Sequence, residues 1–321
     1  MTTRICRFLL GVAMLLAGLV PAVAEDWPTH NVTVVVPVPA GVASDIISRV
    51  VFEQVGKQVG QTFVIENRVG AGGTIGANAV AKSTPDGHTI LVYGSIAAAN
   101  ALYKKLPYDT GADFTAVVPF GQTPLAVVTG AGHFTTLAEL IAAAKAKPGA
   151  LNYSTVGVGS AAHFGAARLL VSAGISAQHI PFKGGEWMTE TIAGRIDFSV
   201  PPVTTAIGSL RDGKLTPLAV MSAKRISSLP DAPTMIEAGL TADAIYPFYT
   251  GAYLPSKTPR AIIDKLHDEV MKALANPEVQ KRLTGIGVEP MPMTQAEFED
   301  LFKKDIAANL ELVKAANIPT Q

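Results

Sequence analysis

The chain has 321 residues, which is enough for two compact domains and excludes a single small one. Hydrophobic residues make up 48% of the sequence and charged residues only 16%, so disorder is excluded as the main state. Lys and Arg together number 26, as do Asp and Glu, and this balance excludes the basic field that attracts nucleic acid at long range.

The first 24 residues have the pattern of a secretory signal peptide. Arg4 and Arg7 precede an apolar run over 8–20, and the segment ends in small residues before Glu25. The alternative is a membrane anchor, but this run is shorter than the ~20 residues that a helix needs to cross a bilayer. We therefore expect cleavage after residue 24 and a mature protein in the periplasm.

Cysteine usage agrees with export into a bacterial periplasm. Cys6 is the only cysteine and lies in the expected signal peptide, so the mature chain would have no disulfide. An exported fold without disulfides needs a large hydrophobic core, which a chain of this size can supply. The mature chain would carry 24 basic against 26 acidic residues, a net charge of −2.

The first unit after this segment is a strand, a turn and a helix. Residues 32–36 are mostly valine and apolar on both alternating faces, which is typical of a strand buried on both sides of a sheet. Pro37 ends the strand, and apolar residues at helical spacing predict a helix over 44–59 that Gly60 closes.

The same unit recurs along the chain. The first half predicts strands over 63–65 and 89–93 and helices over 75–82 and 97–102, followed by an irregular stretch over 107–116. A second set has predicted strands near 124–128, 151–154, 179–182, 196–200 and 215–221, and helices over 137–145, 160–173, 186–193 and 203–212. A last strand near 251–254 precedes helical segments over 259–275, 277–284 and 294–316. This alternation predicts an α/β protein with two sheets and a ligand cleft between them.

Four turns at predicted strand ends are rich in small residues, and each opens a helix: 37–45, 70–76, 154–160 and 181–185. A helix N-terminus has unpaired N–H groups and a positive dipole end, so small residues there create a site for a carboxylate or phosphate. The hydroxyls of Ser44, Thr155 and Ser160 would add donors. Helix capping without a ligand is the alternative for any one turn, but four turns at matching strand ends favour a ligand site.

Short motifs follow one another along the whole mature chain. They are Trp27-Pro28, Pro37-x-Pro39-Ala40-Gly41-x-x-x-Asp45, Glu66-Asn67-Arg68-x-Gly70-Ala71-Gly72-Gly73-x-Ile75-Gly76, Pro85-Asp86-Gly87-x-Thr89, Leu106-Pro107-Tyr108-Asp109, Lys147-Pro148-Gly149-x-Leu151-Asn152-Tyr153-Ser154, Pro181-Phe182-Lys183-Gly184-Gly185 and Leu229-Pro230-Asp231-x-Pro233-Thr234. In this order they resemble the Bug receptors, the solute-binding proteins of tripartite tricarboxylate transporters.

The resemblance implies a type II periplasmic binding-protein fold, in which two α/β domains joined by a two-strand hinge close on a ligand. The chain would cross between the domains near 121–129 and return near 246–254. Domain 1 would then comprise 25–125 plus 247–321, and domain 2 would comprise 126–246.

The resemblance also implies the function. A receptor of this family captures a small organic carboxylate and hands it to integral membrane transporter subunits or to a sensor protein. The first loop and the loop over 154–160 would grip the carboxylate through backbone amides, hydroxyls and ordered water. We expect a monomer without cofactor, metal or nucleic-acid partner.

Departures from the family pattern predict the ligand class. Val38, Val42 and Ala43 make the first loop more aliphatic than the family's glycine-rich version. After the strand near 196–200, where the family often has a polar residue that meets an amine, this chain has two prolines. The ligand should therefore lack an α-amino group, which favours a dicarboxylate with a hydrocarbon spacer or an aromatic acid. Tyr249 replaces a tryptophan of the family and is expected to pack against the ligand.

The residues expected to contact the ligand lie in the loops described above and at neighbouring strand ends. They are Val38, Ala40, Gly41, Val42, Ala43, Ser44, Ser95, Thr155, Gly157, Gly159, Ser160, His163, Phe182, Gly184 and Thr204. For His163 two interpretations stay open, the cleft and a capping or surface position. Lys183 is expected in solvent, and Asp45 is expected to fix the first loop, since it would repel an anion.

Enzyme signatures are weak in this sequence. The stretch over 70–76 resembles a dinucleotide fingerprint, but Ile75 stands where that motif needs glycine. The six histidines have no metal-ligand spacing, and we expect no catalytic residue. A secreted hydrolase with a dispersed Ser, His and Asp site is the alternative, because such triads need not be local in sequence. Loss of the ligand on incubation would favour that alternative.

Overall fold

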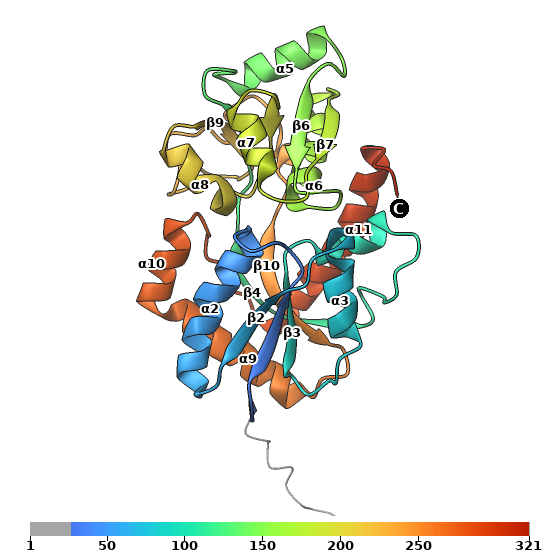
Figure 1. Cartoon of the computed structure of the whole chain (residues 1–321), viewed down its shortest axis with the longest axis vertical. Helices are drawn as coiled ribbons and strands as arrows, with labels where there is room; N and C mark the ends of the chain where they lie inside the picture. The colour runs from blue at the N-terminus through green and yellow to red at the C-terminus, as the bar shows by residue number, and fades with distance from the viewer. Residues whose placement is uncertain (1–26, 321) are drawn as a thin grey trace, which may run out of the picture.

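Two five-stranded sheets form the framework of the protein in the computed structural model, which describes residues 27–320 (Figure 1). The first sheet has the order β2-β1-β3-β10-β4 and consists of β1 (Val32–Val36), β2 (Phe63–Asn67), β3 (Thr89–Tyr93), β4 (Phe114–Gln122) and β10 (Tyr249–Pro255). The second has the order β7-β6-β8-β5-β9 and consists of β5 (Ala126–Gly130), β6 (Asn152–Thr155), β7 (Gln178–Pro181), β8 (Phe198–Ser199) and β9 (Leu215–Val220). We call the two halves the β1 domain and the β6 domain. The expected signal peptide lies outside the described residues.

Helices cover both sheets. Those that follow strands of the β1 domain are α2 (Ala43–Val59), η1 (Ala71–Gly73), α3 (Thr74–Ala81), η2 (Ile96–Ala98), α4 (Ala99–Leu102), α9 (Arg260–Ala275), α10 (Pro277–Gly285) and α11 (Gln295–Ala315). Those of the β6 domain are α5 (Leu137–Ala146), α6 (Ala161–Ala173), α7 (Glu186–Ile192), α8 (Val203–Arg211) and η3 (Ala242–Ala244). Among the described residues, no helix has both the length and the hydrophobicity of a membrane span.

The first predicted unit is confirmed. β1 pairs in parallel with β2 and β3, and its valines are almost entirely buried, as expected for a strand covered on both faces. α2 follows and buries Ile47, Val51 and Phe52 in the same hydrophobic cluster as Leu266 of α9. Gly60 ends α2 with a φ of 70°, a left-handed conformation that glycine adopts without steric cost.

One strand was missed by the sequence prediction. The stretch over 107–116 was expected to be irregular and no strand was expected before 124, yet β4 begins at Phe114 and pairs with β10 along its length. Pro119 and Gly121 within β4 are poor strand formers, so the local pattern indicates a break. The β4–β10 pairing has two register irregularities, and one of them lies between Pro119 and Gly121.

Two chain segments cross between the domains and form the hinge. After β4 the chain enters β5 through 123–125, and after β9 it returns to β10 through 221–248. The segments are joined where the Thr123 N–H donates to the Phe248 carbonyl at 2.7 Å. Because the returning strand β10 runs antiparallel to β3 and β4, the first sheet is mixed rather than parallel. These features confirm two α/β domains with a two-strand hinge.

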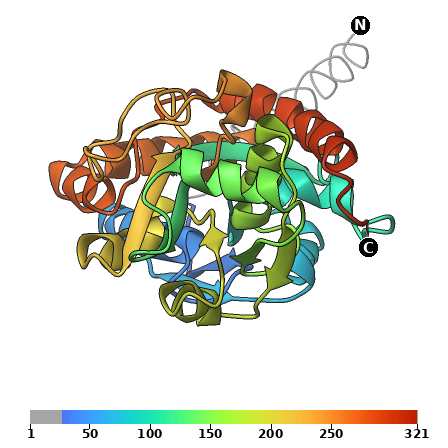
Figure 2. The same ribbon diagram turned by 90° about the horizontal axis from the view of Figure 1, so that it is seen from above.

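The C-terminal helix extends from one domain to the other. α11, in red at the edge of the molecule in Figures 1 and 2, packs on β4 through Phe298 and Phe302 near its start. Leu312 and Val313 near its end belong to the same hydrophobic cluster as Phe164 of α6. The chain division at 125 and 247 stays a prediction, and α11 is a third connection between the domains.

Candidate functional site

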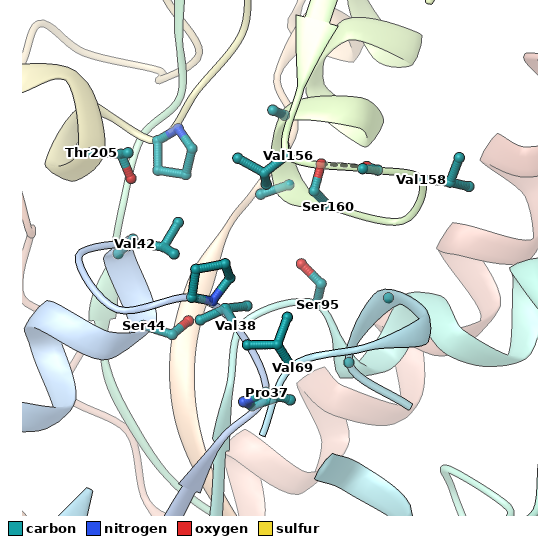
Figure 3. A pocket seen from close by; sticks show the side chains of 18 of the residues that line it. Pro37, Val38, Val42, Ser44, Val69, Ser95, Val156, Val158, Ser160 and Thr205 are labelled. Atoms are coloured by element: carbon teal, nitrogen blue, oxygen red, sulfur yellow. Dashed lines mark hydrogen bonds between the residues drawn. The ribbon is translucent and has the colours of Figure 1, made fainter. Parts of the chain in front are cut away.

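A cavity of about 500 Å³ lies between the two domains, at the carboxyl ends of β1 and β6 (Figure 3). Residues from all four small-residue turns line it. The lining residues are 37–39, 42–44, 69–73, Tyr93, Ser95, 156–158, 160–162, 181–183, Trp187, 201–202, Thr205 and Phe248. This is the position at which open α/β sheets bind ligands, because the loops after the strands converge there.

The first loop is held in place by Asp45. Its carboxylate accepts the Gly41 N–H at 2.9 Å and is bonded by Arg49 at 2.9 Å. The side-chain amide of Asn67 donates to it at 3.0 Å and also to the Val38 carbonyl at 3.0 Å. Burial alone would raise the pKa of Asp45, but these hydrogen bonds outweigh burial and lower it. Asp45 therefore fixes the loop as expected and does not line the cavity.

Two helices begin at the cavity from opposite domains. α2 starts at Ala43 after Val42, which gives it no side-chain cap. α6 starts after Ser160, whose hydroxyl accepts the His163 N–H at 3.3 Å and donates to the Gly157 carbonyl at 2.8 Å. Both first turns line the cavity, so their N–H groups and positive dipole ends are available to an anion.

The loop after β6 differs from the prediction at Thr155. Val156, Gly157, Val158 and Ser160 line the cavity, but Thr155 does not, and its side chain is buried. The Thr155 hydroxyl accepts the Gly157 N–H at 3.1 Å and lies 2.7 Å from Nε2 of His179. Its hydrogen-bonding capacity is used within the protein, so Thr155 is a structural residue of this loop.

His163 also lies away from the cavity. The sequence left it open between the cleft and a capping or surface position, and the structure has it buried and stacked on His179 with ring centroids 4.2 Å apart. Burial, with His179 nearby, lowers the pKa of His163 to about 3, and burial lowers that of His179 to about 4. His163 is thus neither a surface residue nor a lining residue.

The fifteen candidates from the sequence divide between lining and non-lining positions. Those that line the cavity are Val38, Val42, Ala43, Ser44, Ser95, Gly157, Ser160 and Phe182. Those that do not are Ala40, Gly41, Thr155, Gly159, His163, Gly184 and Thr204. In the first turn of α8, Thr205 lines the cavity in place of Thr204, because neighbouring helical residues point about 100° apart.

Several lining residues were not predicted. The sequence predicts an anion site at the turn over 70–76 but names none of its residues as a ligand contact, and residues 69–73 line the cavity. Phe248 lines the cavity, whereas Tyr249, expected to pack against the ligand, instead donates its hydroxyl to Asp305 at 2.5 Å. Adjacent side chains along an extended chain point in opposite directions. Whether residue 248 or residue 249 faces the cavity therefore depends on where the strand begins.

The walls of the cavity are mostly apolar. Figure 3 shows Val38, Val42 and Val69 on one side and Val156 and Val158 on the other. Most of the polar lining side chains carry hydroxyls, and these are Ser44, Tyr93, Ser95, Ser160 and Thr205. The Thr205 hydroxyl has no hydrogen-bond partner in the protein. Among the described lining residues Lys183, which is exposed, carries the only charge.

A metal centre is not indicated in the part of the chain that the structure describes. Within residues 27–320, no three His, Cys, Asp or Glu side chains are grouped so that they could hold a metal ion. The cavity instead offers amides, hydroxyls and one ammonium, which are donors suited to an organic anion.

Comparison with known proteins gives a consistent family. The model of the tripartite tricarboxylate transporter family receptor matches residues 47–318. Protein BugT of Bordetella pertussis is 30% identical over 291 residues, which is 89% of this chain and 89% of BugT.

Two solved structures are similar over nearly the whole chain. Rpa4515 of R. palustris, solved with adipate, has a TM-score of 0.86 at 30% identity. The match covers 92% of this chain and 100% of the Rpa4515 chain. MatC (Rpa3494) from Rhodopseudomonas palustris, solved with bound malate, has a TM-score of 0.83 at 31% identity. The match covers 89% of this chain and 100% of the MatC chain. Since the family match spans both sheets, the chain belongs to the tripartite tricarboxylate transporter receptor family, which its motifs resemble, and is a solute-binding protein rather than an enzyme.

Proposed function

We propose that this receptor binds a non-amino dicarboxylate with an apolar body in the cavity between its domains, and delivers it to a tripartite tricarboxylate-type membrane transporter or a sensor protein. The observation that carries the proposal is the pairing of two helix N-termini, those of α2 and α6, across a cavity with apolar walls. An anion binds at helix N-termini because the unpaired N–H groups and the dipole both favour negative charge.

The ligand's first carboxylate would lie between these two helix starts. Ser44 and Ser160 are the lining hydroxyls nearest to them in sequence, and Gly157 allows the backbone to approach the ligand closely. The hydrocarbon body would pack against Val42, Val156 and other apolar lining residues. A buried carboxylate bonded in this way needs no counter-ion, since each bond to a charged group contributes about 1.5–3 kcal/mol.

An α-amino group has no carboxylate partner among the described residues that line this cavity. The lining residues include no Asp or Glu among the residues described, and Pro201 and Pro202 at the end of β8 have no N–H and no charge. Burying an ammonium without an opposite charge costs several kcal/mol. This argument supports a ligand that is not an amino acid.

The second carboxylate would select the length of the ligand. Thr205 offers a hydroxyl without a protein partner, and Lys183 offers a charge at the edge of the cavity. The two similar structures were solved with adipate and with malate, which are dicarboxylates without an amino group. Both observations support a dicarboxylate, and an aromatic diacid meets the same conditions.

A side-by-side calorimetric titration tests this proposal. The purified protein is titrated with adipate, malate, terephthalate, citrate, aspartate and glutamate under one set of conditions. We expect adipate or terephthalate to bind most tightly and the two amino acids most weakly. Tightest binding of aspartate or glutamate would contradict the ligand class, and binding of none of the acids would contradict the carboxylate proposal.

A further inference from the structure

Two histidines meet directly behind the loop over 155–160. His163 lies in the first turn of α6 and His179 in β7, and their rings stack with centroids 4.2 Å apart and planes 11° from parallel. Tyr153 of β6 also stacks on His179, at 5.0 Å. Neither histidine lines the ligand cavity, so neither is placed to touch a ligand there.

Each histidine is hydrogen-bonded to one end of this loop. At its start, Nε2 of His179 lies 2.7 Å from Oγ1 of Thr155. Near its end, the Gly159 N–H donates to Nδ1 of His163 at 3.3 Å. The two stacked rings therefore connect both ends of the loop to one aromatic stack.

We propose that the stacked pair of His163 and His179 positions this loop so that Gly157 and Ser160 face the ligand. Both histidines would then be positioning residues for binding, not ligand contacts. This inference rests on the proposed function, in which the loop holds a carboxylate.

The backbone of the loop explains why such an anchor matters. Gly157 and Gly159 have φ values of +121° and +85°, which glycine adopts easily but leaves just as easily. Within the loop, the Gly157 N–H donates to Thr155 Oγ1 at 3.1 Å and the Ser160 hydroxyl donates to the Gly157 carbonyl at 2.8 Å. The histidines add contacts from outside the loop, and a loop that is already ordered loses less entropy when it binds a ligand.

The bond from Gly159 also defines the protonation of His163. Nδ1 accepts a hydrogen there and so carries none, which leaves a neutral ring with its proton on Nε2. A cationic His163 would place two N–H groups against each other at this contact. Burial, together with His179, lowers the pKa of His163 to about 3, in agreement with a neutral ring.

The test compares His163→Asn with His163→Leu. Asn has a polar atom near the position of Nδ1 and can accept the Gly159 N–H, whereas Leu fills the space without an acceptor. We expect His163→Leu to weaken adipate binding roughly tenfold in calorimetry and to speed exchange of the Gly159 amide hydrogen. His163→Asn should return both to within about threefold of the wild-type values.

A second pair of variants covers the other end of the loop. His179→Gln keeps a polar atom near the position of Nε2, and His179→Leu removes it. The affinity for adipate should therefore fall in the His179→Leu variant and recover in the His179→Gln variant. This pair decides the question if His163→Leu does not fold. The matched control is His133→Leu, which changes a histidine of the same domain that pairs with Asp197, and it should alter neither affinity nor Gly159 exchange.

The outcomes separate this inference from the proposed function. A folded His163→Leu or His179→Leu protein with wild-type affinity and wild-type Gly159 exchange would overturn the positioning role. A wild-type protein that binds neither adipate nor malate would overturn the proposed ligand class instead. Exchange of the Gly159 amide, which needs no ligand, would then decide the positioning role by itself.

Discussion

Neutral donors surround the cavity, and this governs how single residues contribute to binding. Ser44, Ser95, Ser160 and Thr205 offer hydroxyls, and Lys183 is the one charged side chain among the described lining residues. Hydrogen bonds in a site that excludes water are stronger than the same bonds in solvent. Affinity should therefore depend more on the geometry of amides and hydroxyls than on ion pairing.

Replacement of Lys183 by Ala should weaken adipate binding by about 1 kcal/mol or less, because an exposed charge is screened by solvent and salt. Lys183→Arg is the matched control, since it keeps the charge at the same position. Calorimetry at two salt concentrations measures the effect. A loss of several kcal/mol in Lys183→Ala would identify Lys183 as a direct counter-ion of a ligand carboxylate.

The stacked pair of His163 and His179 predicts a pH dependence of stability. Burial first, and His179 second, lowers the pKa of His163 from the ordinary value of 6.5 to about 3, and burial lowers the pKa of His179 to about 4. Below pH 6.5 the unfolded chain binds protons at these sites while the folded protein does not. The free energy of unfolding therefore falls as the pH decreases from 6.5 toward 4, by at most about 1.4 kcal/mol per pH unit for each histidine.

Urea unfolding at a series of pH values between 7 and 4.5 measures this slope. In His163→Asn one of the two histidines is gone, so the decline should be shallower than in the wild-type protein. His267→Asn removes a histidine elsewhere in the chain and controls for general charge effects. An identical slope in His163→Asn and wild type would show that His163 is protonated in the folded state over this range.

At the scale of elements, α6 begins with a residue that serves both the helix and the loop before it. The Ser160 hydroxyl accepts the His163 N–H at the start of α6 and donates to the Gly157 carbonyl in the loop. A helix cap alone explains the first bond, while the lining position favours a role in binding. The two roles are separable because one changes stability and the other changes affinity.

Ser160→Ala should lower the free energy of unfolding by about 1 kcal/mol, as expected for loss of an N-cap. It should also weaken adipate binding by about 1.5–3 kcal/mol if the hydroxyl bonds a carboxylate. Ser160→Thr keeps the hydroxyl and is the control. Urea unfolding measures the change in stability, and calorimetry measures the change in affinity. An unchanged affinity in a destabilised Ser160→Ala protein would show that Ser160 only caps α6 and does not bind the ligand.

Among the elements, β4 shows what a local pattern misses. Its sequence contains Pro119 and Gly121, which interrupt the strand pattern, and its partner β10 follows it by more than a hundred residues. The pairing with β10 outweighs the unfavourable local propensity because it supplies backbone hydrogen bonds and burial along the whole strand. No window of sequence around β4 contains that information.

At the scale of the whole molecule, the cavity exists only because two domains face each other. Two crossing segments, joined at Thr123 and Phe248, and the long helix α11 connect them. A ligand that contacts both sides stabilises the arrangement in which the domains are close, by an amount set by its affinity and concentration. Closure of the domains is the signal that a membrane partner would read in the proposed function.

The N-terminal sequence predicts that the whole protein is exported to the periplasm. Expression of the full chain in a Gram-negative host should give a periplasmic protein whose intact mass corresponds to residues 25–321, because the first 24 residues have the charge, apolar run and cleavage pattern of a signal peptide. Arg4 and Arg7 replaced by Glu should retain the protein in the cytoplasm. A periplasmic protein with the mass of the full chain would contradict cleavage.

The sequence by itself determined the architecture, the family and the loops that line the cavity between the domains. Strand, turn and helix periodicity are local properties, and the small-residue turns lie where helices begin, so both can be read from neighbouring residues. Val38, Val42, Ser44 and Phe182, which the sequence predicts as ligand contacts, line the cavity. The apolar character of the cavity followed from the same residues.

Only the tertiary structure decided which side chains of those loops face the cavity. Thr155 turns toward His179 and His163 stacks behind the loop, whereas Thr205, Phe248 and other residues from remote segments complete the lining. In an irregular loop the direction of a side chain depends on backbone angles and on partners far away in sequence. The spacing of residues along the chain contains neither the backbone angles nor the distant partners. The sequence therefore predicts which loops line the cavity but not which of their side chains face it.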